Sequence, residues 1–370
     1  MYRFYRTAGD GLKKAAAPRW ARECRRGIVT DADVTQARNY CLDQLKRGDY
    51  EAYLIRQFVP RSAHDAYHAL RTLNLELARL PETVSNPGIG RLRIQFWRDT
   101  IDRVFAGNPP REPIAILLYN AMADLRARAG DGSASSIKFW LLRFLKTREK
   151  HMENRPFVSL AALEDYSENT YATLMYMTLA SMPMQSVHMD HLASHIGKAC
   201  GIVATLRGIP VLAAPSKPIQ GPSGAHLGNT RSPALLLPLD VMAEEGLKEE
   251  EVFRKGPNAE GLYDAVFQVA TRANDHLITA REMLKNLRLG KGPDHAYEHG
   301  DEAEHVYSSA AHGVETADAD ITRGFGVLLE AVAAEDYLKR LESANFDPFK
   351  VKKSWKLPWA LWKALKNNQI

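Results

Sequence analysis

The sequence predicts an all-α protein. Apolar residues recur three or four positions apart in one segment after another, which is the spacing that places them on one face of a helix. No segment alternates apolar and polar residues as a half-buried strand would, and no stretch repeats another. With 370 residues, of which 45% are hydrophobic, the chain is long enough to bury a large core.

The predicted helices follow one another through most of the chain. Thr30 supplies an N-cap for the first helix, which ends near Lys46, and Pro60 opens the helix that contains the leucine-rich residues 70–80. Further apolar-patterned or helical segments are predicted at 49–59, 91–105, 114–128, 137–149, 160–182, 190–207, 241–250, 262–286 and 324–342. The segment 190–207 organises the rest, and Pro210 is expected to stop or kink it.

Two segments within the predicted helical domain, residues 27–348, lack this periodicity. Residues 214–232 are rich in proline, glycine and serine. Residues 289–320 are rich in glycine, histidine and acidic side chains. Both are expected to be loop insertions, the second a disordered one on the surface, because neither offers an apolar face to bury.

The net charge of +5 is concentrated in two tails. Residues 1–26 and 349–370 each carry +6, so the remaining residues sum to −7. The basic balance therefore does not indicate a nucleic-acid-binding body, and no nucleic-acid partner is expected. The arginine-rich, acid-poor segment 1–26 is typical of a mitochondrial presequence, because a matrix-negative potential drives cationic amphipathic segments inward. A disordered basic tail is the alternative.

The C-terminal tail interleaves tryptophan and leucine with lysine and contains no acid. This composition is typical of a helix that lies in a bilayer interface. The predicted membrane contacts are Trp355, Trp359, Trp362, Lys356 and Lys363. The alternative is a last helix that docks its tryptophans onto the body. No stretch reaches 18 consecutive apolar residues, so we expect a matrix-side protein peripheral to the inner membrane.

Four stretches resemble the squalene/phytoene synthase family. They are HIGKACGIVATLRGIP (195–210), ALRTLNLELARL (69–80), RLRIQFWRDTIDRVFAG (91–107) and LLLPLD (235–240). The resemblance implies a single-domain, terpenoid-synthase-like helical bundle in which two helices face each other across a central cavity. In that family, each of the two helices carries a DxxxD motif that holds magnesium against prenyl diphosphates.

The aspartates are the part of the family pattern that this chain lacks. Gly208 and Leu212 stand at the positions of the second motif, and Asn74 and Ala78 at those of the first. Ionisation of a prenyl diphosphate requires Mg²⁺ held by carboxylates and by the phosphates themselves. We therefore expect an inactive homologue that needs no cofactor.

The resemblance is closer to one branch of the family, whose members help to build mitochondrial NADH:ubiquinone oxidoreductase, respiratory complex I. It implies an assembly factor with complex I subunits or assembly intermediates as partners, which no residue pattern shows by itself. One alternative is a prenyl or lipid transferase with altered metal ligation, for which Glu76, Glu82 and Asp99 are the carboxylates to consider. The other is a non-catalytic protein that binds an isoprenoid or lipid in the cavity.

A pocket can persist without the aspartates. Its candidate residues are Arg71, Asn74, Glu76, Arg93, Trp97, Arg98, Tyr166, Asn169, Lys198 and Arg207. Arg207 matches the family arginine that precedes the second motif, and it can pair with a phosphate or an acidic lipid head group. A structural ion pair with Glu76 or another carboxylate is the interpretation we favour, because buried charges are usually paired.

No metal site is predicted. The acidic and histidine residues Asp294, His295, His299, Glu302 and His305 lack a helical scaffold, so we interpret them as incidental. The residues His188, His191 and His195 share a helix face without a cysteine or glutamate at metal spacing, which favours capping or core roles. The three cysteines show no zinc spacing, and Glu164, Asp165 and Glu168 are interpreted as a solvated face.

Overall fold

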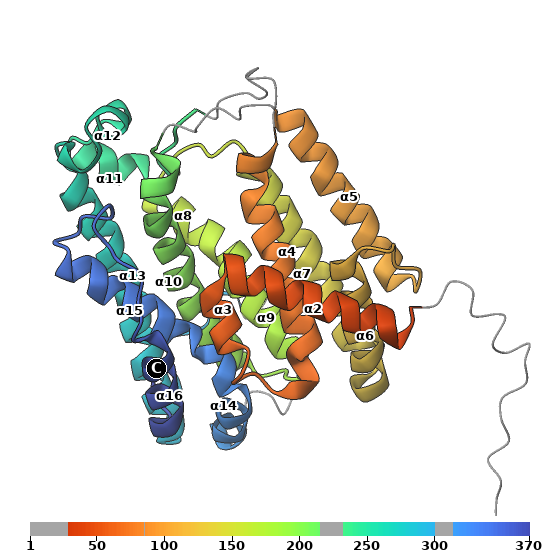
Figure 1. Cartoon of the computed structure of the whole chain (residues 1–370). Coiled ribbons are helices and arrows are strands. Elements are labelled where there is room, and N and C mark those ends of the chain that lie inside the picture. The colour runs from red at the N-terminus through yellow and green to blue at the C-terminus, as the bar shows by residue number, and fades with distance from the viewer. Residues whose placement is uncertain (1–28, 85, 215–231, 300–313) are drawn as a thin grey trace, which may run out of the picture.

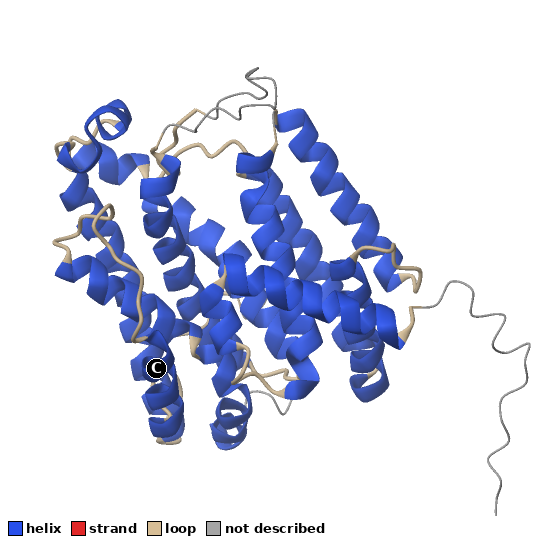
Figure 2. Ribbon diagram, viewed as in Figure 1, coloured by secondary structure: helices blue, strands red, loops and turns tan. Residues whose placement is uncertain are grey.

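Helices make up every regular element that the computed structural model describes, over residues 29–84, 86–214, 232–299 and 314–370 (Figures 1 and 2). The all-α prediction is thus confirmed. The longer helices are α2 (Asp31–Gly48), α4 (His64–Thr83), α5 (Pro87–Phe105), α6 (Pro113–Ala129), α7 (Asp131–Lys150), α10 (Val187–Leu212), α13 (Leu262–Arg288), α14 (Val314–Leu328) and α15 (Glu330–Ser343). The shorter ones are α3 (Tyr50–Ile55), η1 (Arg61–Ala63), α8 (Leu160–Ser167), η2 (Glu168–Ala172), α9 (Thr173–Ala180), α11 (Leu239–Glu244), α12 (Glu249–Lys255), η3 (Gly256–Asn258) and α16 (Leu357–Asn367).

Helix starts follow the capping residues in the sequence. Thr30 forms a capping box with Asp33 at the start of α2, each satisfying a backbone N–H of the other. Asn86 caps α5 and Pro87 occupies its first position, where a missing N–H costs nothing. These local devices fix where α2 and α5 begin, and burial of one face of each helix then decides how they pack.

Helix α10 lies at the centre of the molecule and contacts α8, η2, α9, α13, α14 and α15 (Figure 1). Two glycines allow this packing. A Cβ at Gly197 would lie 2.3 Å from the Cα of Ala172, and one at Gly201 would lie 2.3 Å from Ser167 Oγ. Because the two glycines are one turn apart, α10 approaches the α8–η2 segment more closely than larger side chains would permit.

Two expectations about helix boundaries are corrected. Pro210 does not end α10, which continues to Leu212. A second proline, Pro81, also lies inside its helix, α4. Both prolines fall in the last turn, so each removes only one hydrogen bond near an end that is already weakly bonded. The predicted helix 160–182 is interrupted by η2, a π-helical turn in which one extra residue per turn is accommodated.

The predicted tails and loops are described only in part. Residues 1–26 and most of 214–232 lie outside the described residues. The segment 289–320 is not loop throughout, since α14 begins at Val314. Its first part, residues 289–299, runs back over α10, where His295 lies beside His191 and His195, and Tyr297 donates a hydrogen bond to the hydroxyl of Tyr176 on the neighbouring helix α9.

The C-terminal segment ends in α16, which packs on α15. Leu357 and Leu361 are the buried residues of α16, whereas the side chains of Trp355, Trp359 and Trp362 are 77%, 69% and 52% exposed. The alternative in which the tryptophans dock onto the body is therefore wrong, because leucines do the docking. Among the residues described, no helix is both long and apolar enough to cross a bilayer.

Candidate functional site

A cavity of about 450 Å³ separates α4 from the C-terminal half of α10. Its walls also include the turn between α2 and α3, the end of α7, the α8–η2 segment and α15. Residues at the four positions that correspond to the family's aspartates, Asn74, Ala78, Gly208 and Leu212, all line this cavity. The two facing helices are thus arranged as the resemblance implied, and none of these four side chains is a carboxylate.

The carboxylates that do line the cavity are already bonded within the protein. Glu330 forms a buried ion pair with Arg71 and accepts a hydrogen bond from Tyr67. Glu51 accepts from Arg207 at 2.8 Å, and Asp49 caps α3 by accepting from a backbone N–H. Glu82 is the remaining carboxylate of the lining. In the family, each of the two facing helices carries a pair of carboxylates four residues apart, which together hold magnesium and a diphosphate. The four carboxylates of this lining form no such pair.

Arg148 differs from the other cavity arginines in having neutral partners. Its guanidinium donates to Asn74 and Tyr166, and it lies over three aromatic rings, those of Phe144, Tyr166 and Tyr171, at 5.3 to 5.9 Å. The side chain is buried, and among the described residues no carboxylate lies within ion-pair distance of it. The cavity therefore contains a buried positive charge that no carboxylate of the described residues neutralises.

Cys200 is the one thiol of the cavity lining. Burial raises the pKa of the Cys200 thiol to about 12, so it stays protonated at physiological pH. A protonated thiol is a poor nucleophile and a poor metal ligand.

The ten predicted pocket residues divide into two groups. Arg71, Asn74, Tyr166 and Arg207 line the cavity. The other six, Glu76, Arg93, Trp97, Arg98, Asn169 and Lys198, are not part of the lining. For Arg207, the favoured interpretation as a structural ion pair agrees with the structure, with Glu51 rather than Glu76 as the partner.

The six residues outside the lining lie on other helix faces. Glu76 follows Arg71 by five residues, which turns it well away from the cavity. Between α4 and α5 it accepts a hydrogen bond from Trp97 and forms an ion pair with Arg93. The remaining contacts are Arg98 with Glu149, Asn169 with Arg143 and Asp165, and Lys198 with Glu168 and Glu298. Of the carboxylates considered for altered metal ligation, Glu76 and Asp99 thus lie outside the cavity lining, and only Glu82 is part of it.

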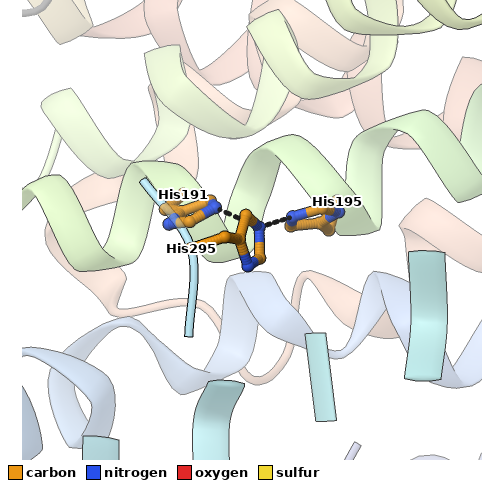
Figure 3. A group of neighbouring side chains, drawn as sticks. All are labelled: His191, His195 and His295. Atoms are coloured by element: carbon orange, nitrogen blue, oxygen red, sulfur yellow. Dashed lines mark hydrogen bonds between the residues drawn. The ribbon is translucent and has the colours of Figure 1, made fainter. Parts of the chain in front are cut away.

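A second cluster lies on the N-terminal half of α10, away from the cavity. The imidazole of His295 lies between those of His191 and His195, and its Nε2 is 3.0 Å from the Nε2 of each (Figure 3). On its other side, His195 Nδ1 lies 3.1 Å from His276 Nδ1, and His276 Nε2 lies 2.7 Å from Glu164. Burial and the neighbouring imidazoles lower the pKa of His191 to about 4 and that of His195 to about 2.

This cluster could not be predicted from local patterns, because its histidines come from two groups that are far apart in the sequence. His191 and His195 are one turn apart on α10, but His295 is a hundred residues further on, and no local pattern connects them. The interpretation of Glu164 and Glu168 as solvated was also wrong. Glu168 is buried and accepts from Tyr176 and Ser194, while Glu164 bonds His276 and Arg272.

An all-α bundle with a cavity between two facing helices is the architecture of isoprenoid-synthase-like proteins, and solved structures bear this out. The squalene synthase HpnC from Alicyclobacillus acidocaldarius superposes with a TM-score of 0.58 at 12% sequence identity, over 86% of this chain and 98% of that one. A dehydrosqualene synthase in complex with ligand superposes with a TM-score of 0.56 at 13% identity, over 91% and 98%.

The chain belongs to the squalene/phytoene synthase family, whose sequence profile matches residues 45–293. It is similar to proteins named NADH dehydrogenase (ubiquinone) complex I, assembly factor 6. The Bos taurus protein is 31% identical over 310 residues, and the Homo sapiens protein 30% identical over 311; each match covers 84% of this chain and 75% of the relative. The Drosophila melanogaster homologue is 29% identical over 311 residues, covering 83% and 76%.

Proposed function

We propose that this protein is an assembly factor for mitochondrial respiratory complex I and that it acts through its scaffold and surfaces rather than through catalysis. The observation that carries the proposal is the similarity at about 30% identity, over 84% of the chain, to relatives named complex I assembly factor 6. Its partners would be complex I subunits or assembly intermediates. The alternative of a prenyl or lipid transferase has less support, since the described residues that line the cavity do not include the carboxylate pairs that the chemistry needs.

The test is deletion of the gene in the source organism, followed by native gel electrophoresis of mitochondrial membranes. We expect fully assembled complex I and its NADH:ubiquinone activity to be lost and to return when the wild-type chain is expressed. Complexes III and IV, measured on the same gels, serve as the control for general mitochondrial damage. Normal complex I in the deletion strain would refute the assignment.

Loss of catalysis makes a separate prediction. Purified protein incubated with farnesyl diphosphate and Mg²⁺ is expected to release no diphosphate above the blank, because the residues at 74, 78, 208 and 212 offer no carboxylate to hold the metal. A bacterial squalene synthase assayed in parallel is the positive control. Mg²⁺-dependent release of diphosphate by this chain would support the transferase alternative instead.

We further propose that the protein works in the matrix, at the surface of the inner membrane, after import directed by residues 1–26. The exposed Trp355, Trp359 and Trp362 beside Lys356 and Lys363 support contact with anionic lipid, since aromatic rings favour the interface and each lysine contributes about 1 kcal/mol near an anionic leaflet.

Replacing Trp359 and Trp362 by glutamate should abolish cosedimentation with phosphatidylcholine–cardiolipin vesicles. Tyr50→Glu, at an exposed aromatic residue on α3, is the matched control. Equal sedimentation of all three proteins would exclude this contact.

Arg148 favours a second role for the cavity, namely binding of an anionic lipid or isoprenoid without turnover. A buried guanidinium with neutral partners is costly unless an anion joins it. Farnesyl monophosphate is a suitable probe when EDTA is present, because EDTA removes any metal that could contribute to binding. Calorimetry should detect binding by the wild type and by Arg98→Met, which alters an ion pair outside the cavity lining, but not by Arg148→Met. Equal binding by all three proteins, or by none, would exclude this role.

A further inference from the structure

The imidazoles of His191, His195 and His295 converge as metal ligands do. Their ligand nitrogens all lie within 4.8 Å of one another, and two of the separations are 3.0 Å (Figure 3). Two nitrogens bound to zinc at about 2.0–2.1 Å and at a tetrahedral angle lie about 3.3 Å apart. Small rotations of the side chains would therefore bring the three nitrogens to the distances that a zinc ion requires.

Hydrogen bonding alone does not satisfy this arrangement well. A neutral imidazole nitrogen is either a donor or an acceptor, and His295 Nε2 faces two other Nε2 atoms at the same distance. If His295 Nε2 carries a proton, that proton has to be shared between two acceptor nitrogens. If it carries a lone pair, that lone pair has to accept from two donors. A cation at the point of convergence would accept a lone pair from all three rings.

The surroundings of His195 select the tautomer that binds metal. When the Nε2 proton of His276 is assigned to the Glu164 carboxylate, His276 Nδ1 is left as an acceptor for the Nδ1 proton of His195. The Nε2 of His195 then presents its lone pair toward His295. A carboxylate that acts through a hydrogen-bonded ring is the kind of outer partner that orients histidine ligands in metal sites.

The loop that carries His295 is held in place by contacts of its own. Gly290 ends α13 with a positive φ of 70°, and Asn286 donates to the Asp294 carboxylate at 3.1 Å. Beyond His295, Tyr297 bonds Tyr176 and Glu298 pairs with Lys198 of α10. His295 is therefore positioned by the residues on both sides of it, which is what a pre-formed site needs.

We propose that His191, His195 and His295 bind a divalent transition-metal ion of the zinc class, and that the ion fastens residues 289–299 to α10. Three neutral imidazoles suit zinc, copper or nickel and do not suit magnesium or calcium, which prefer oxygen ligands. The fourth coordination position is left to water. The proposed metal site uses the N-terminal half of α10, whereas residues of its C-terminal half line the cavity. The two sites share no residue.

Cobalt(II) titration of the full chain, with any purification tag removed, tests the proposal. The wild type should take up one equivalent with the visible absorption of four-coordinate cobalt, and zinc should displace it. His295→Ala removes a ligand from an exposed segment without disturbing the core, so a folded variant is expected. Its affinity should fall by at least the roughly 10–100-fold that loss of an outer-shell partner costs.

His64→Gln is the matched control, since His64 bonds Val59 on a different part of the molecule. It should bind cobalt as the wild type does. Binding of less than one equivalent by the wild type, or equal binding by His295→Ala, would overturn the metal site.

Trypsin cleavage after Lys291, which is exposed, tests the fastening role. Zinc should slow cleavage at this residue in the wild type and not in His295→Ala. Cleavage of the wild type that zinc does not slow would overturn the proposal that the ion holds this segment.

Discussion

The polar groups around the two halves of α10 are bonded in different ways. Toward its C-terminal end, facing the cavity, charged side chains are mostly paired with one another: Arg71 with Glu330 and Arg207 with Glu51. Toward its N-terminal end, neutral rings of His191 and His195 meet a third imidazole, with no opposite charge between them. The charges around the C-terminal half of α10 are thus mostly neutralised by ion pairs, with Arg148 as the exception, whereas the N-terminal half carries imidazole nitrogens that converge on one point.

This difference sets the cavity apart from the histidine cluster in what a bound cation would meet. In the cavity, arginines pair with two of the four lining carboxylates, Glu330 and Glu51, so a divalent cation bound by these two would have to compete with existing ion pairs. In the histidine cluster, a cation would complete the bonding instead of displacing it.

The buried ion pair in the cavity should be the most sensitive point. Glu330→Gln leaves the Arg71 guanidinium buried without its counter-charge, and we expect the free energy of unfolding to fall by about 3–5 kcal/mol. Urea denaturation followed by circular dichroism measures it. The paired variant Arg71→Met with Glu330→Leu should recover much of the loss. A Glu330→Gln variant as stable as the wild type would show that the buried Arg71 guanidinium does not need Glu330 as its counter-charge.

The close crossing of α10 and η2 should be next in effect. A methyl group at Gly197 would meet the backbone of Ala172, which cannot rotate away, so Gly197→Ala should destabilise the protein by about 1–3 kcal/mol. Gly132→Ala is the matched control, because nothing lies within 4 Å of its Cβ and alanine favours helix. Thermal unfolding of both variants should show a lower midpoint only for Gly197→Ala. A lower midpoint for both would mean that the crossing is not special.

The outer carboxylate of the histidine cluster gives a smaller effect on a different quantity. Glu164→Gln removes the charge that orients His276 and, through it, His195. Affinity for cobalt(II) should fall about 10–100-fold, with the stoichiometry unchanged. Isothermal titration of the variant beside the wild type measures this. An unchanged affinity would show that Glu164 pairs with Arg272 alone and has no influence on the cluster.

The ion pair at the cavity rim should matter least. Glu51 and Arg207 are both partly exposed, with side-chain accessibilities of 24% and 42%, so water replaces much of what each loses. Glu51→Gln should cost about 0.2–1 kcal/mol of unfolding free energy in urea denaturation. A loss as large as that of Glu330→Gln would contradict the distinction between a buried and a solvated pair within this cavity.

Helical periodicity and the family resemblance predicted the architecture because both are properties of local sequence. Asn74, Ala78, Gly208 and Leu212 could be placed on the cavity walls in the same way, since spacing along α4 and α10 determines which residues share a face. Partners remote in sequence could not be predicted. Glu330 as the partner of Arg71, and Arg148 on the far wall, depend on how whole helices pack.

The histidine cluster shows the same limit more strongly. His295 sits in a stretch with no periodicity, and nothing in that stretch indicates that it returns to α10. The signal that could have found it is the unusual supply of histidines in both segments, three on one helix face and several after α13. Composition identifies the residue types, but only the fold brings them together.

A rescue experiment tests directly whether function resides in the scaffold and not in magnesium chemistry of the cavity. Deletion cells would express either the wild type or the double variant Glu51→Gln, Glu82→Gln, which removes two carboxylates of the cavity lining. Complex I would then be quantified on native gels at matched protein levels. We predict equal restoration by both chains. If a double variant that accumulates stably failed to restore complex I, the carboxylates of the cavity would be needed for function, and a role of the scaffold alone would be excluded.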